Sequence, residues 1–85
     1  MALYMPRHPI SAIQYTGNNV TECQRFADRD FIVRDEKPFV YTIEFNDYEK
    51  LNAGDFIVYD NYHTGYYIVP EKIFLAKYYK VEEGS

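Results

Sequence analysis

The 85-residue sequence has no tryptophan, one cysteine and only four glycines. The single cysteine, Cys23, excludes an internal disulfide and a zinc site built from several cysteines, and it suits a reducing compartment. No run approaches the roughly 18 apolar residues of a membrane-spanning helix. The first fifteen residues also lack the basic start and unbroken apolar stretch of a secretory signal. We therefore expect a soluble, intracellular protein without a membrane partner.

Positive charge is also scarce. Nine Lys and Arg stand against 13 Asp and Glu, a net charge of −4, so the whole molecule does not attract a nucleic-acid polymer. The four glycines are isolated from one another and cannot form a phosphate-cradling loop. Neither histidine has the spacing of a metal site. We expect no catalytic residues, no metal and no cofactor.

Aromatic residues, in contrast, are abundant. The chain holds ten Tyr and six Phe, and 47% of its residues are hydrophobic, which is typical of a globular protein. Its length suits a single domain over residues 1–85. A domain this small cannot bury so many rings under a short helix, and exposed apolar surface usually marks an association surface. Self-assembly is therefore expected.

The patterning predicts an α+β domain with a mostly antiparallel sheet of five to six strands, one main helix and a short C-terminal helical turn. The helix is expected to start at Asn19, in a capping-box spacing with Glu22, and to bury Cys23. The expected strands are Ile10–Tyr15, Phe31–Arg34, Phe39–Phe45, Phe56–Tyr59, Tyr66–Val69 and Ala76–Val81.

The connections between these strands are expected to be polar. Asp35–Pro38 reads as a turn, Asn46–Leu51 as a connection, and Asp60–Gly65 as the closing turn of a hairpin. Alternation gives the Phe39–Phe45 strand one strongly apolar face, made of Phe39, Tyr41, Ile43 and Phe45.

Charge is distributed unevenly along the chain. Glu44–Asp60 contains five acidic residues and Lys50, whereas Asn61–Lys80 contains three lysines and Glu71. Six of the ten tyrosines lie between residues 59 and 79, in or beside the basic stretch. Rings next to lysines suit a small ligand with flat bases and phosphates, although tyrosine is also a common strand residue. Alternation places one of Tyr66 and Tyr67 in the core and leaves its neighbour available.

Several short motifs resemble a family of small bacteriophage proteins. They lie within residues 10 to 81 and are Ala12-Ile13-Gln14-Tyr15 with Gly17-Asn18, Gly54-Asp55-Phe56-Ile57-Val58, Gly65-Tyr66-Tyr67, Pro70-Glu71-Lys72-Ile73-Phe74, and Lys77-Tyr78. Such phage proteins include the anti-CBASS sponges, which sequester the cyclic nucleotide signals of bacterial immunity. Many relatives carry a lysine-bearing hairpin where this chain has Asp60–Thr64, and a Cys-Lys pair where it has Ile68-Val69.

The resemblance implies a binder of cyclic dinucleotides such as 3′3′-cGAMP, without a catalytic step, acting in the cytoplasm of the infected bacterial host. It also implies a homo-oligomer, with a tetramer expected. A two-fold axis suits such a ligand because each subunit then offers the same groups to one half. We expect Tyr67 or Tyr15 to stack on a base and Lys72 to pair with phosphate. Further hydrogen bonds are expected from Gln14, Tyr62, His63 or Arg7.

Two other functions remain open from the residues. The acidic segment Glu44–Asp60 would suit a phage inhibitor that binds a host protein. The second alternative is an enzyme that degrades nucleotides. The glycines, Pro70 and Phe74 within the motifs are expected to define the fold rather than to contact a ligand.

Overall fold

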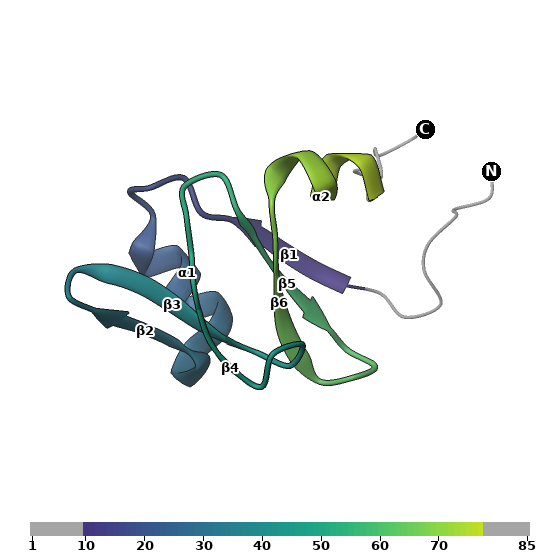
Figure 1. Ribbon diagram of the computed structural model, residues 1–85, viewed down its shortest axis with the longest axis horizontal. Coiled ribbons are helices and arrows are strands. Elements are labelled where there is room, and N and C mark those ends of the chain that lie inside the picture. The colour runs from purple at the N-terminus through teal and green to yellow at the C-terminus, as the bar shows by residue number, and fades with distance from the viewer. Residues whose placement is uncertain (1–9, 78–85) are drawn as a thin grey trace.

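The computed structural model describes residues 10–77 (Figure 1). This part of the chain has an α+β fold, which confirms the predicted class. Its strands are β1 (Ile10–Gln14), β2 (Phe31–Arg34), β3 (Lys37–Thr42), β4 (Asp47–Lys50), β5 (Phe56–Asp60) and β6 (Gly65–Val69). Its helices are α1 (Val20–Ala27), the 3-10 turn η1 (Asp28–Asp30) and α2 (Glu71–Lys77).

The six strands form two antiparallel sheets of three strands. The first has the order β1-β5-β6 and the second the order β2-β3-β4. The sheets meet where the end of β3 lies against β6, and there the N–H of Ile43 donates to the carbonyl of Tyr66 at 3.1 Å. Figure 1 shows the two sheets side by side, with α1 next to the second sheet and α2 next to the first.

The core lies between α1 and the two sheets. Cys23 and Ala27 of α1 are buried, as the helical pattern predicted, and they pack with Tyr15, Phe31, Val40, Leu51 and Ile57. Burial raises the pKa of the Cys23 thiol, and Glu22 adds to that shift. Cys23 is therefore a core residue rather than a reactive thiol.

The start of α1 was placed correctly, but the predicted capping box does not form. Asn19 is the N-cap residue, and its side chain makes no hydrogen bond to the helix. Its Nδ2 instead donates to the carbonyl of Gln14, while its Oδ1 accepts from the backbone N–H of Thr16. The side chain thus ties the helix start to the end of β1.

The strongly apolar face of the third expected strand is not the face that is buried. Val40 and Thr42 are buried together with Pro38, whereas Phe39 and Tyr41 are half-exposed. Phe45 is 60% exposed because β3 ends at Thr42 and residues 43–46 turn the chain. Asn46 adopts a φ of +55°, which asparagine tolerates better than most residues, and its Oδ1 accepts the hydroxyl of Tyr41 at 2.6 Å.

β4 was predicted as a polar connection. Its sequence, DYEK, has no apolar alternation because β4 is an outer strand whose residues are mostly exposed. Its partner β3 determines its structure through the pairs Thr42↔Asp47 and Val40↔Glu49. The preceding β2–β3 turn is also shorter than expected, since it consists of Asp35 and Glu36 and leaves Pro38 inside β3.

The C-terminal helical element is longer than predicted. α2 extends over Glu71–Lys77, so Ala76 and Lys77 are helical rather than the start of a strand, and the rest of Ala76–Val81 lies outside the described residues. Phe74 holds the helix on the first sheet by stacking on Phe56, with ring centroids 3.8 Å apart. Ile73 and Leu75 are 55% and 62% exposed, so the expected apolar surface is present.

Candidate functional site: a groove along β6

Alternation along β6 separates its two tyrosines, as predicted. Tyr66 and Ile68 pack against the core. Tyr67 points to the opposite face of the sheet, where its partner on the neighbouring strand β5 is Val58. The Tyr66 hydroxyl donates to the carbonyl of Phe26 at 3.0 Å, and burial is the main cause that raises its pKa. Tyr66 therefore fixes α1 to the first sheet and leaves Tyr67 to the outer face.

Asp60 organises the turn between β5 and β6. One of its carboxylate oxygens accepts from the backbone N–H of Tyr62 at 2.9 Å and from that of His63. The other lies 2.7 Å from Nδ1 of His63 and accepts the hydroxyl of Tyr67 at 3.3 Å. Because a carboxylate can only accept, Nδ1 of His63 carries the proton in this pair. Asp60 thereby fixes both an imidazole and a phenol.

These hydrogen bonds keep Asp60 ionised. The side-chain bond from His63 is the main cause that lowers the pKa of Asp60 to about 2; desolvation opposes it, and the backbone donors Tyr62 and His63 lower the pKa further. Asp60–Gly65 was predicted to close a hairpin, and the pair of Asp60 and His63 lies at this connection between β5 and β6.

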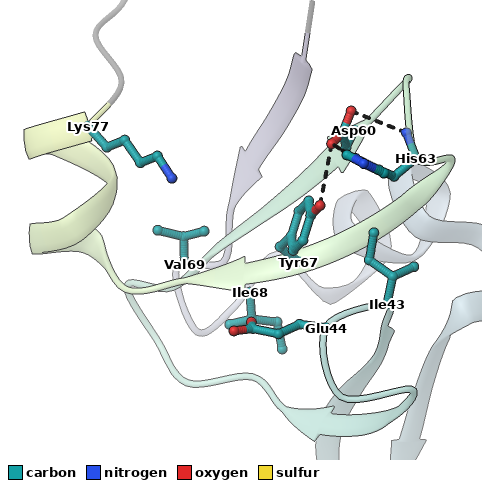
Figure 2. Close-up of a pocket in the computed structure, with 8 residues that line it drawn as sticks. All are labelled: Ile43, Glu44, Asp60, His63, Tyr67, Ile68, Val69 and Lys77. Carbon is teal, nitrogen blue, oxygen red and sulfur yellow. Dashed lines mark hydrogen bonds and ion pairs between the residues drawn. The ribbon is translucent and has the colours of Figure 1, made fainter. Parts of the chain in front are cut away.

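An open groove of about 730 Å³ runs along the outer side of β6 (Figure 2). The β3–β4 turn forms one wall, the β5–β6 turn forms one end, and the last residue of α2 lies at the other end. The residues that line it are Ile43, Glu44, Asp60, His63, Tyr67, Ile68, Val69 and Lys77.

The groove combines an apolar surface with charges of both signs. Ile43, Ile68 and Val69 supply the apolar part. Figure 2 shows Tyr67 and Val69 on one side of β6 and Ile68 on the other side, next to Glu44. Figure 2 also shows the side chain of Lys77 reaching from α2 toward the groove, opposite the turn that holds Asp60. Such a surface can take a ligand that has a flat face, hydrogen-bond donors and an anionic group.

Gly65 brings the two sheets together beside this groove. A Cβ atom at Gly65 would overlap Cγ2 of Ile43 and lie 3.1 Å from its Cβ, so only glycine allows Ile43 to pack where it does. Gly54 is needed for a different reason, because its φ is +99°. The motif glycines thus define the fold, as expected.

The structure brings some of the predicted site residues together and separates others. Tyr67 and His63 line the groove, and the exposed ring of Tyr62 lies edge-on to His63 with centroids 4.9 Å apart. Lys72 is exposed on α2 but does not line the groove. Arg7 lies outside the described residues.

Tyr15 and Gln14 have structural roles in the described chain. Tyr15 is only 8% exposed and belongs to the core, so the prediction that its ring could stack on a base is wrong for this structure. Nε2 of Gln14 donates to the carbonyl of Gly54 at 3.1 Å, and Gly54 N–H donates to the carbonyl of Tyr15. The two most recognisable motifs therefore hold each other in place.

Six of the residues that line the groove were not among the predicted site residues: Ile43, Glu44, Asp60, Ile68, Val69 and Lys77. Lys77 had been counted in the basic stretch, but it was assigned to a strand because the length of α2 was underestimated. Ile43 and Glu44 reach β6 through the contact between the sheets, which leaves no local pattern in the sequence.

Within residues 10–77, no three His, Cys, Asp or Glu side chains are grouped as metal ligands would be. The same part of the chain has no helix that is long and apolar enough to cross a membrane. Comparisons with known proteins found no match for this chain among family models, curated sequences or solved structures.

Proposed function

We propose that this protein binds a cyclic dinucleotide such as 3′3′-cGAMP in the groove along β6 and holds it without cleaving it. The observation that carries the proposal is the combination, in one groove, of the Tyr67 ring, an apolar surface and Lys77. Together with the phage motifs of the sequence, it supports an immune-evasion protein that removes a CBASS signal in the cytoplasm of an infected bacterium.

Tyr67 is the residue that would stack on a base. Its hydroxyl is bonded to Asp60 and its Cα pairs with Val58, so the ring is held at both ends. A ring that is already ordered loses little side-chain entropy on binding. Stacking of one base on such a ring contributes about 1 to 3 kcal/mol.

The charges of the groove match different parts of a nucleotide. Lys77 can pair with a phosphate. Glu44 can accept hydrogen bonds from the exocyclic amine of a base, as carboxylates do in other complexes. Asp60 is already bonded to His63 and Tyr67, so it orients these groups rather than facing a phosphate unpaired.

Tight binding of a dinucleotide requires more contact surface than one subunit offers. Nanomolar affinity requires roughly −12 kcal/mol, and an open groove on one small subunit encloses only part of a dinucleotide. A second subunit would supply the remaining walls, and a nearly symmetric ligand would suit a two-fold axis between them. The proposal therefore includes a homo-oligomer, with a tetramer expected.

Titration calorimetry with a panel of cyclic nucleotides, including 3′3′-cGAMP, tests the proposal. Tyr67→Ala should weaken binding roughly 5- to 150-fold through the lost stacking, whereas Tyr67→Phe keeps the ring and should change affinity little. Lys77→Ala should weaken binding, and Lys72→Ala on the same helix is its matched control. The absence of heat with every nucleotide, or equal losses for both lysine variants, would contradict the proposal.

A second function is favoured by a different surface. The turn after β3 exposes Phe45 by 60%, and the following strand β4 exposes Tyr48 by 36%, beside the acidic residues Glu44 and Asp47. Aromatic residues in an acidic setting suit a basic patch on a host protein. Pull-down from host lysate with wild-type protein and Phe45→Ser separates the two functions. A host inhibitor would retain one protein stoichiometrically and lose it in the variant, whereas a nucleotide sponge would retain none.

A further inference from the structure

β1 is an outer strand of the first sheet. Among the described strands, it is hydrogen-bonded to β5 and to no other. The N–H of Tyr15 donates to the carbonyl of Asp55, which fixes the phase of the ladder at that end. In an antiparallel pair, residues alternate between bonding to the partner strand and directing their N–H and C=O groups away from it.

This alternation identifies the outward-facing groups of β1. Counting back from Tyr15 along the register, Ile13 and Ser11 bond to β5, while Gln14, Ala12 and Ile10 direct their backbone groups outward. The outward carbonyl of Gln14 is confirmed by the hydrogen bond that it accepts from Nδ2 of Asn19. Ala12 lies at the centre of this set, and its small side chain is exposed.

Two other outer strands, β6 and β4, are protected. At the free edge of β6, the N–H of Ile43 donates a hydrogen bond to the carbonyl of Tyr66. β4 carries Asp47, Glu49 and Lys50, charges that oppose pairing with a copy of itself. β1, with the sequence ISAIQ, contains no charge and no proline. Two negatively charged molecules can therefore approach along this strand without placing like charges face to face.

We propose that two copies of the chain pair antiparallel through β1, with Ala12 on the two-fold axis. In this register Ala12 bonds to Ala12 of the second copy, and Ile10 of each strand faces Gln14 of the other. About four backbone hydrogen bonds form without disturbing the bond between Gln14 and Asn19. The two β1-β5-β6 sheets become one continuous six-stranded sheet.

This interface leaves the proposed ligand site accessible. β6 is at the opposite edge of the sheet from β1, so both grooves lie on the outer margins of the six-stranded sheet. The inference specifies one interface of the homo-oligomer that the proposed function includes. It does not depend on the identity of the ligand.

Sedimentation analysis of the full chain without nucleotide tests the register. Ala12→Lys and Ala12→Glu each place like charges on the axis, so each variant should have half the mass of the wild-type assembly. An equal mixture of the two should regain the wild-type mass, because position 12 faces only itself. Val33→Lys, at an exposed position on the outer strand β2, should keep the wild-type mass.

The opposite results would overturn the inference. These are a monomeric wild type, unchanged mass in both Ala12 variants, no recovery in the mixture, or dissociation by Val33→Lys instead. If a variant fails to fold, hydrogen exchange of the Ala12 amide in the wild type tests the same interface. This N–H points away from β5, so it should exchange slowly only if it is hydrogen-bonded to a second copy. An assembly that forms through β1 but binds no nucleotide would contradict the proposed function alone.

Discussion

Replacing Gly65 with alanine tests how the two sheets are joined. The added Cβ would overlap Cγ2 of Ile43 and lie 3.1 Å from both its Cβ and its Cδ1. Rotation of the Ile43 side chain can move Cγ2 and Cδ1, but Cβ is attached to a backbone that is bonded to Tyr66. Rotation can relieve the overlap with Cγ2, but the close contact with Cβ remains, so the backbone at Ile43 and β6 have to move apart by a few tenths of an ångström.

The expected cost follows from two opposing effects. Overpacking by a methyl group costs about 1 to 3 kcal/mol. Gly65 does not have a positive φ, so alanine suits its backbone and restricts the unfolded chain, which stabilises by about 0.4 to 1 kcal/mol. We expect Gly65→Ala to lower the free energy of unfolding by about 1 to 2 kcal/mol.

Urea denaturation followed by circular dichroism measures this change. Ile43→Ala removes Cγ2 and Cδ1 and keeps only the Cβ at 3.1 Å, so most of the clash is lost and the double variant should be more stable than the sum of the two single effects by about 1 kcal/mol. A Gly65→Ala variant as stable as the wild type, or strictly additive effects, would refute the contact between the sheets.

Three further predictions concern single side chains. Because the pKa of Asp60 is lowered to about 2, its contribution to stability is present above pH 4 and is lost as pH falls toward 2. Asp60→Asn should flatten this part of an acid-denaturation profile; an unchanged slope would contradict it. Tyr66→Phe should cost about 1 kcal/mol in urea denaturation by removing the bond to Phe26. Phe74→Ala should cost about 2 kcal/mol and speed hydrogen exchange in α2, through loss of the stack on Phe56. Unchanged exchange would show that the stack does not hold the helix.

Elements with a buried face could be predicted from the sequence. The apolar stripe of α1 and the alternation of Tyr66 and Tyr67 each reflect contact with the core, so their patterns predicted their orientation. The strand over Phe39–Phe45 was misoriented because Pro38, Val40 and Thr42 face the core, although the opposite face is more apolar. Hydrophobicity alone favoured the wrong face.

The groove could be predicted only in part. Tyr67 and His63 were identified because they are local to one hairpin. Glu44 and Ile43 join them through the contact between two sheets, which depends on Gly65 having no side chain. Lys72 was preferred to Lys77 because it was expected to point away from a buried Ile73 and Phe74, whereas Ile73 is exposed and α2 extends as far as Lys77.

Native mass measurement of the wild-type protein, with and without a panel of cyclic nucleotides, tests the central claim most directly. We expect a homo-oligomer that gains the mass of intact 3′3′-cGAMP or a related cyclic dinucleotide, and a Tyr67→Ala variant that keeps the assembly but needs a higher nucleotide concentration for the same gain in mass. An unchanged mass with every nucleotide, or recovery of a cleaved product, would contradict sequestration in the groove along β6.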